Sequence, residues 1–324
     1  TALVFGLALL LAGVNSSFHN EVIRTVESFR ADAWIVPKGV GGPISAPIPF
    51  PASQAKAVRS LPAVRAADPV IFGGALTGAD LERVNVIGIV PNGVGSPFGA
   101  TWPGFGPSGT AVVDASLGKA VGERFDLNGG LHTVVGVTHG LTYFAGEPVV
   151  VIPLADAQRI AFDGKPLATA IIARGAPGGA PPGFKILRNP DIESDLARPI
   201  APARQTVAMV RSLLWIVAAG IIGAIVYLTA LERTKDFAVL KATGASTSSL
   251  LGALILQAVV LTAVSAALAV GIEAAMQPAA AMSVEVSAFD FVTLVVVALV
   301  VGVIASLAAI RRAVTVDPAL AFGG

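Results

Sequence analysis

Three long apolar stretches set the strongest limit on how this chain can fold. Residues 213–231, 242–272 and 291–310 contain no charged side chain. About 20 mostly apolar residues cross the ~30 Å hydrocarbon core as a helix, because lipid offers an open backbone no hydrogen-bond partner. The middle stretch begins with the polar segment ATGASTSS, so we expect entry near Leu250 and exit near Gly271. The sequence predicts membrane helices at 212–231, 247–272 and 291–310.

The N-terminal segment, residues 1–14, is apolar but short, and no basic region precedes it. We interpret residues 1–16 as the C-terminal part of a first membrane helix whose beginning is missing. A cleaved signal sequence is the alternative, because its apolar region is also 7 to 15 residues long. The lack of an Ala-x-Ala-like site before His19 counts against it.

Composition agrees with a membrane protein and excludes several kinds of site. The chain is 54% hydrophobic and 13% charged, and its mean hydropathy is +0.76. The 22 basic residues nearly balance the 21 acidic ones, so no basic face predicts nucleic-acid binding. Without cysteine there is neither a disulfide nor a thiolate metal site. His19, His132 and His139 are too few and too scattered to predict a metal centre.

Residues 17–211 are too many and too polar for a membrane loop and predict a folded α+β domain. Runs rich in Val and Ile, bounded by Gly, Pro or Asn, predict strands at 33–36, 84–90, 110–113, 131–137, 148–152 and 168–173. Helical patterns fall at 53–61, 154–162 and 192–196. Residues 37–51 and 175–183 are rich in Pro and Gly and predict loops.

The distribution of Lys and Arg predicts the orientation, because these residues stay on the cytoplasmic side of short loops. Arg233, Lys235 and Lys241 lie in the segment 232–246, and Arg311 and Arg312 begin the tail 311–324. The loop 273–290 has no Lys or Arg. We expect the segment 232–246 and the tail in the cytoplasm, and the loop and the large domain outside an inner or plasma membrane.

The segment LERTKDFAVLKATGASTSSLL is the most specific in the chain. It is similar to a cytoplasmic coupling segment of ABC transporter permeases, in which a Glu-Arg pair leads into a short helix and then a Lys-Ala-x-Gly-Ala sequence. The matching residues are Glu232, Arg233, Phe237, Leu240, Lys241, Ala242, Gly244 and Ala245. The tail is similar to the same family's Asp-Pro-x-x-Ala-Leu type of ending, with imperfect spacing, through Asp317, Pro318, Ala319 and Leu320.

Two stretches of the outer domain extend the likeness. Residues 134–137 form a Val-Val-Gly-Val run, and Ile152, Pro153, Leu154, Ala157 and Gln158 form a Val-Ile-Pro-Leu-x-x-Ala-Gln type of turn. With the order of the segments, they make the chain resemble the MacB/FtsX/LolC-like family of ABC transporter permeases, also called type VII or mechanotransmission permeases. Residues 37–51 are the least familiar part.

The resemblance implies four transmembrane helices per subunit, the first truncated, and a MacB-like core or porter domain over 17–211. It also implies a non-catalytic permease subunit that pairs with two copies of a cytoplasmic ATPase, which would carry the ATP and Mg²⁺. A second permease copy, identical or related, would complete the transporter. Export, or outer-leaflet extraction of a hydrophobic or peptide-like substrate, is the implied activity.

Contact with the ATPase is expected along the coupling segment. Phe237 and Leu240 are three residues apart and so share one face of a helix, which can dock in a groove of a partner. An ordinary membrane-surface turn is the plainer interpretation, because interfacial aromatic residues are common. The residues expected to contact the partner are Glu232, Arg233, Lys235, Asp236, Phe237, Leu240 and Lys241.

Small residues four apart along the apolar stretches predict close helix packing. They are Ala219 and Gly223, then Ala263, Ala267 and Gly271, and then Ala298, Gly302 and Ser306. Gln257, deep in the stretch 242–272, is expected to bind a neighbouring helix by a hydrogen bond rather than a ligand. A carrier driven by ions normally needs ionisable groups within the membrane, and these stretches have none away from their ends.

No catalytic motif is complete, and we predict no cofactor in this chain. Gly118-Lys119 lacks the Ser or Thr and the earlier Gly of a phosphate-binding loop, and the sequence around Ser108 lacks the last Gly of a nucleophile elbow. Two other functions are open. One is an FtsX-like mechanotransmitter that activates a cell-wall hydrolase. The other, of a different class, is a membrane-anchored extracytoplasmic sensor or ligand-binding protein.

Overall fold

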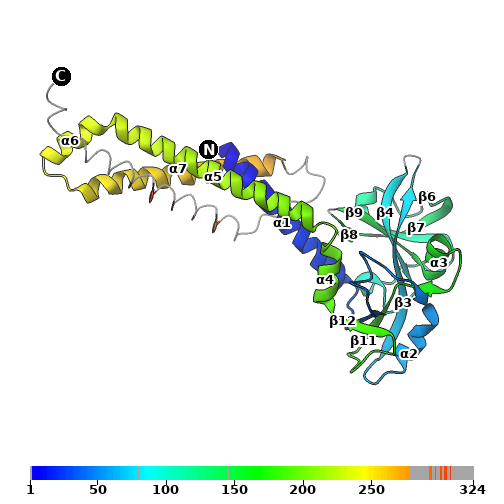
Figure 1. Ribbon diagram of the computed structural model, residues 1–324. Coiled ribbons are helices and arrows are strands. Elements are labelled where there is room, and N and C mark those ends of the chain that lie inside the picture. Colours follow the sequence, from blue (N-terminus) through cyan, green and yellow to red (C-terminus); the bar gives the residue numbers. More distant parts are fainter. Residues whose placement is uncertain are drawn as a thin grey trace. The chain divides into compact units, whose positions relative to one another are not determined.

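The computed structural model describes residues 2–78, 81–144 and 146–276, together with residues 292, 293, 296, 300, 303, 304 and 307. The chain divides into two compact units. The outer unit is Phe18–Pro202, and the membrane unit is Thr1–Ser17 with Ala203–Gly324. Figure 1 shows their strands and helices along the sequence.

Six strands of the outer unit close into a barrel. They follow one another in the order β3 (Ala66–Thr77), β4 (Glu82–Ile89), β9 (Glu147–Pro153), β5 (Thr110–Asp114), β7 (Gly130–Thr138) and β6 (Arg124–Leu127). The residue pair Thr77 and Leu127 joins β3 to β6 and closes the ring. The pairs β4–β9 and β5–β7 are parallel and the other pairs are antiparallel. Inward-facing residues such as Ile71, Val86 and Val150 form a buried cluster.

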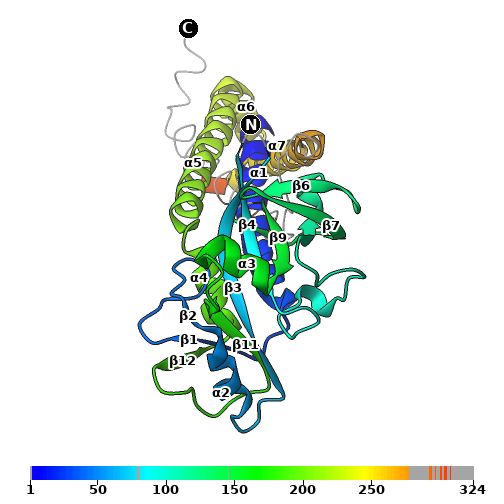
Figure 2. The ribbon, with the colours of Figure 1, turned by 90° about the vertical axis from the view of Figure 1, so that its right-hand side faces the viewer.

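The longest strand, β3, also belongs to a second part of the sheet. Its first residues pair with β11 (Ala170–Arg174), which continues to β1 (Ala33–Pro37) and β12 (Phe184–Leu187). Figure 2 shows β3 reaching from β4 to β11. A small separate sheet pairs β2 (Phe50–Pro51) with β10 (Leu167–Ala168), and β8 (Thr142–Tyr143) pairs with β9. Helix α2 (Ala55–Arg59) covers a third cluster, which includes Ile35, Phe50 and Val58.

Two helices complete the largest core of the outer unit. Helix α1 (Ala2–Ser28) contributes Val22 and Val26, which with Phe29 recur every three to four residues and so line one side of the helix. Phe29 makes edge contacts with Trp34 and Phe72, whose ring centroids lie 5.3 and 5.7 Å away. Helix α4 (Asn189–Ala197) adds Ile192 and Leu196, and its Asn189 Oδ1 accepts the indole hydrogen of Trp34 at 2.9 Å.

A buried carboxylate fixes the Pro/Gly-rich segment 37–51. Asp195 of α4 is fully buried and accepts hydrogen bonds from the backbone N–H groups of Ile44, at 2.8 Å, and Ser45, at 3.2 Å. A Cβ on Gly42 would lie 2.1 Å from the carboxyl carbon of Asp195. The segment needs glycine there because backbone and carboxylate meet without room for a side chain.

The predicted α+β outer domain is confirmed, and each of its predicted strands and helices has a counterpart. Helix α3 (Leu154–Phe162) has the predicted bounds. The strand predicted at 168–173 is divided between β10 and β11. Strands β3, β6 and β12 and the two-residue strands β2 and β8 were not predicted. The N-terminal helix does not end near residue 16 but continues to Ser28, because its second half packs on the core.

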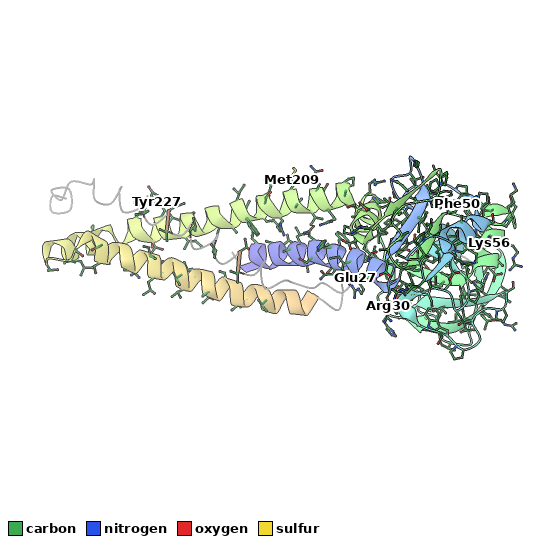
Figure 3. The ribbon with its side chains drawn as sticks, turned by 90° about the horizontal axis from the view of Figure 1, so that it is seen from below. Glu27, Arg30, Phe50, Lys56, Met209 and Tyr227 are labelled. Carbon is green, nitrogen blue, oxygen red and sulfur yellow. The ribbon has the colours of Figure 1, made fainter. Side chains whose placement is uncertain are left out.

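The membrane unit contains α5 (Ala201–Glu232), α6 (Thr234–Ala242) and α7 (Thr247–Met276). Two helical segments of the described residues are long and apolar enough to cross a membrane, Ala201–Thr229 and Ser248–Ser265. Both helices exceed the predicted spans: α5 starts earlier than residue 212, and α7 continues beyond residue 272. Side chains such as Met209 project from α5 (Figure 3). The rest of the predicted loop 273–290, most of the helix 291–310 and the tail 311–324 lie outside the described residues.

Candidate functional site

Helix α6 forms a short turn of nine residues between the two long apolar helices. Helix α5 ends at Glu232, and the backbone N–H of Arg233 donates to Thr229 O at 3.1 Å, which extends the helical bonding by one residue. Asp236 lies in the first turn of α6. A carboxylate there faces the positive end of the helix dipole and stabilises that end.

The C-terminal end of α6 depends on Gly244. This residue has φ +97°, a left-handed conformation that favours glycine. The turn lets Ala245 N donate to Leu240 O at 2.9 Å, and Thr243 N donates to Val239 O at 3.0 Å. A glycine followed by such a bond back to the helix is the Schellman ending. The Gly-Ala of the coupling motif therefore stops α6 at a fixed residue.

The next helix begins as sharply. Ser246 Oγ accepts a hydrogen bond from Ser249 N at 3.2 Å, which is the N-cap arrangement that serine favours. Leu250 follows at once and is buried. The polar segment ATGASTSS thus ends α6, turns the chain and starts α7, so the C-terminal end of α6 is fixed.

Most of the predicted contact residues lie on an accessible surface. Glu232, Arg233, Lys235 and Asp236 are exposed, and none of the ion pairs between described residues involves them. Leu240 is 46% exposed.

Three more residues of α6 bear on the prediction. Val239, a second large apolar side chain, is 58% exposed. Phe237 and Lys241 belong to α6 by their backbone, and their side chains lie outside what the structure describes. The backbone of α6 thus brings the predicted contact residues together with at least two exposed apolar side chains.

Gln257 behaves as the sequence predicts. Its Nε2 donates to Thr229 Oγ1 at 3.3 Å, which joins α7 to α5. The Thr229 hydroxyl donates in turn to Ile225 O of its own helix at 2.9 Å. Both polar groups therefore have a partner inside an apolar unit, where an unpaired one is costly.

The small residues expected in helix packing have several environments. Ala263, Ala267 and Gly271 lie along α7 and are exposed, so no described part of the chain covers them. Ala219 and Gly223 lie on α5; Gly223 is half-buried, and the side chain of Ala219 is not described. Ala298, Gly302 and Ser306 lie outside the described residues.

The outer unit brings together a serine, a histidine and a carboxylate that are far apart in the sequence. Ser108 Oγ donates to Asp156 Oδ1 at 2.8 Å, and His132 Nε2 lies 3.7 Å from Asp156 Oδ2. In a Ser-His-Asp triad the histidine stands between the other two and takes the serine proton. Here the serine binds the carboxylate directly, and the carboxylate also pairs with Arg159. The cluster fastens a loop to α3. It does not have the order of hydrogen bonds, serine to histidine to carboxylate, that acyl transfer needs.

Lys119, in the incomplete phosphate-binding pattern, has a structural partner. Its Nζ lies 2.6 Å from Glu123 Oε1. This hydrogen bond, with one from Ala120 N, lowers the pKa of the Glu123 carboxyl. No group of three or more His, Cys, Asp or Glu among the described residues is placed to hold a metal ion.

Two family models together cover most of the chain. Residues 1–185 match the MacB-like periplasmic core domain, and residues 208–318 match the FtsX-like permease C-terminal domain. The chain belongs to the MacB/FtsX-like family of ABC transporter permeases. The outer unit with its barrel is the MacB-like part of this permease, and α6 lies within the FtsX-like part.

Curated relatives support the assignment. Two proteins of Mycobacterium tuberculosis (strain ATCC 25618 / H37Rv), both named uncharacterized ABC transporter permease, match along 100% of this chain and 93% of their own length. Rv0072 is 37% identical over 328 residues and Rv2563 is 36% identical over 326 residues. The protein is therefore a permease subunit, which is the non-catalytic part of an ABC transporter and lies in a membrane.

Two solved structures are similar to about half of the chain. The periplasmic region of MacB from Actinobacillus actinomycetemcomitans is 13% identical, with a TM-score of 0.36, and covers 50% of this chain and 90% of its own. The extracellular domain of the noncanonic ABC-type transporter YknZ from Gram-positive bacteria is 12% identical, with a TM-score of 0.34, and covers 49% and 99%.

Proposed function

We propose that α6 is the surface by which this permease receives the motion of a cytoplasmic ATPase, and that the outer unit moves in response. The observation that carries the proposal is the turn itself: a short helix between two apolar helices, ended at Gly244 and separated from α7 by the Ser246 cap, with exposed Val239 and Leu240. Exposed apolar side chains on a short helix with defined ends suit docking into a groove.

The chain also offers a path for the motion. Helix α1 is one continuous helix of 27 residues that contributes to both units. Its second half supplies Val22 and Val26 to the largest core of the outer unit, and Phe29, just after its end, belongs to the same core. Toward the end of the outer unit in the sequence, α5 begins directly after Ile200, which is also buried. Tilting of the helices would pull on the outer unit at both connections.

The complete transporter would contain two permease copies, identical or related, and two ATPase copies that carry ATP and Mg²⁺. Each permease would have four membrane helices, and residues 1–16 would belong to the first. The Lys and Arg of the segment 232–246 support a cytoplasmic α6 and an extracytoplasmic outer unit. Export, or extraction of a hydrophobic or peptide-like substrate from the outer leaflet, is the activity that fits this arrangement.

The test compares Phe237→Asp with Lys235→Ala. Truncation of an anchoring aromatic residue commonly costs ~2 kcal/mol or more, and 1.4 kcal/mol is tenfold in affinity, so Phe237→Asp should weaken ATPase binding at least ~30-fold. Lys235 is exposed, and a surface charge contributes ~0–1 kcal/mol, so Lys235→Ala should change binding little.

The measurements are retention of the ATPase on affinity-purified permease and ATP hydrolysis by the complex. The permease alone should not hydrolyse ATP. Val239→Asp places a carboxylate on one of the exposed apolar side chains of α6 and should also weaken binding. Retention of the partner by Phe237→Asp together with its loss from Lys235→Ala would mean that the contact is electrostatic and that the docking proposal is wrong.

A further inference from the structure

The outer unit has a cavity of about 770 Å³ on the outside of its barrel. Strands β3 and β4 form its floor, and β8, the start of β9 and the segments around Pro47 and Pro199 surround it. Binding sites for small molecules usually measure ~300–1,000 Å³. All of its lining residues belong to the outer unit.

Two consecutive glycines in the middle of β3 line this space, and Gly74, whose missing side chain would point into it, creates much of it. Gly73 and Gly74 are exposed, whereas Phe72 before them and Ala75 after them are buried. A Cβ on Gly73 would have no atom within 4 Å, and one on Gly74 would have only Val84 O, at 3.7 Å. Neither glycine has a positive φ.

Neither crowding nor backbone conformation therefore requires glycine at these two positions. Glycine inside a strand is less stable than alanine, and it often marks a place that a ligand approaches closely. On the cavity face of β3, the free space itself is what Gly74 preserves.

The floor of the cavity is apolar along β3 and is polar along β4, where Asn85 and Arg83 line it. Side chains alternate between the faces of a strand, so Phe72, Gly74 and Leu76 share the cavity face of β3. In the antiparallel register Phe72 pairs with Ile87, Gly74 with Asn85 and Leu76 with Arg83.

Apolar side chains close the other side of the cavity. Phe144, Ile44 and Ile200 line it there. The arrangement offers an apolar surface at one end and side chains with hydrogen-bonding groups at the other.

The polar end carries one charge of each sign. Arg83 and Glu147 lie on neighbouring strands and both line the cavity, yet ion pairs between described residues do not include either of them. Glu147 Oε2 accepts from Asn85 Nδ2 at 3.0 Å, which holds the carboxylate in place. Both groups can still bind a ligand.

Tyr143 adds a polar group within the lining. It is 2% exposed, and its hydroxyl has no hydrogen-bond partner among the described residues. Burial raises the pKa of Tyr143, so the phenol keeps its proton and can donate it. A buried hydroxyl without a partner is costly and calls for one.

We propose that this cavity binds a zwitterionic amphiphile with a single apolar chain. The apolar chain of the amphiphile lies over Gly73 and Gly74, against Phe72, Leu76 and Ile200. The anionic part of its polar end binds Arg83, and the cationic part binds Glu147. A purely anionic end group would place a like charge beside Glu147, whereas a zwitterion complements both side chains.

This site is separate from α6, so its test needs no ATPase. The full chain, purified in a maltoside detergent, is irradiated with lysophosphatidylethanolamine that carries a photoreactive diazirine in its acyl chain, and the labelled peptides are mapped by mass spectrometry. We expect label on β3, β4 and the segment 141–147. Lysophosphatidylglycerol with the same chain, which is anionic, should label these peptides less.

Gly74→Val is the decisive variant. It fills the cavity at a position where a strand residue with a branched side chain is favoured, so label on β3 and β4 should fall at least ~10-fold, or about 1.4 kcal/mol, while thermal stability is kept or raised. A variant that keeps or gains stability and loses the label has a filled cavity, whereas a misfolded variant would lose stability as well. Arg83→Gln should also reduce labelling, and Arg124→Gln, an exposed arginine outside the cavity, should not.

Two outcomes would overturn the proposal. Equal labelling of wild type and Gly74→Val at β3 and β4 would mean that the amphiphile does not occupy the cavity. Stronger labelling by the anionic lysolipid, unchanged in Glu147→Gln, would mean that the polar end does not select a zwitterion.

Discussion

Gly88 on β4 and Ala157 on α3 offer the sharpest test of how the outer unit packs. A Cβ on Gly88 would lie 2.2 Å from Ala157 Cβ and 3.3 Å from Ile71 Cβ. Ala157 belongs to the Val-Ile-Pro-Leu-x-x-Ala-Gln motif. The contact explains why this residue is small, because α3 approaches the sheet at Gly88, where β4 has no side chain.

Gly88→Ala should reduce the free energy of unfolding by about 3 kcal/mol, the upper part of the ~1–3 kcal/mol range for an overpacked core. Ala157→Gly alone should cost ~1 kcal/mol in helix propensity and about 0.8 kcal/mol for the buried methyl. In the double variant the clash is absent, so we expect a loss of only about 2 kcal/mol and a coupling energy of about 3 kcal/mol.

The assay is urea unfolding of the full chain in detergent, followed by near-UV circular dichroism, which reports the packing of Trp34 with Phe29 and Phe72. Gly74→Ala is the matched control, because its Cβ meets only Val84 O at 3.7 Å; it should be neutral or more stable by ~0.5–1 kcal/mol. Additive losses in the double variant, or a change below ~0.5 kcal/mol for Gly88→Ala, would refute the packing argument.

Two further predictions concern single polar contacts. Gln257→Leu should destabilise the α5–α7 pair by ~0.6–1.7 kcal/mol, measured by unfolding in detergent; the same loss in a Thr229→Val background would mean that the 3.3 Å hydrogen bond is not its cause. The N–H of Gly175, and then Arg65, lower the pKa of Asp32, so its stabilising effect is complete above the ordinary carboxyl pKa of ~3.9 and is lost as the pH falls through the lowered pKa. Because Asp32 is 44% exposed the effect is small: Asp32→Asn should lower the melting temperature slightly at pH 7, and this difference should narrow as the pH falls below ~3.9. A gap that widens in acid would contradict this.

The sequence predicts those elements of the outer unit that have a clear local pattern. Strands such as β4, β7 and β9 are rich in Val and are bounded by Gly or Asn, and α3 has helical spacing. Strand β3 was missed although it is the longest, because Gly73 and Gly74 interrupt its apolar run. The cavity that Gly73 and Gly74 line is formed together with residues distant in the sequence, such as Ile44 and Ile200, so the sequence of β3 alone does not reveal it.

The pairing of the strands is beyond such patterns. Strand β4 pairs with β9 at Asn85 and Val149, and nothing local to either strand specifies the other. The same is true of Ser108, His132 and Asp156, which the closed sheet brings together. At α6 the sequence does better, because Gly244 and Ser246 end and start helices through contacts within a few residues, which a sequence pattern can specify.

The position of β1 in the sheet has a consequence for how this protein is made. Strand β1 lies between β11 and β12, with Ala33 opposite Ala173 and Trp34 opposite Leu187. The first strand of the outer unit to be synthesised therefore pairs with the last two strands of that unit. Contacts so distant in sequence form slowly, because a long loop must close first. The outer unit therefore stays incomplete until almost all of it has been synthesised, just before the first residues of α5. Until then the apolar residues of β1 lack their partners, and this interval is when the nascent permease is most exposed to aggregation and proteolysis.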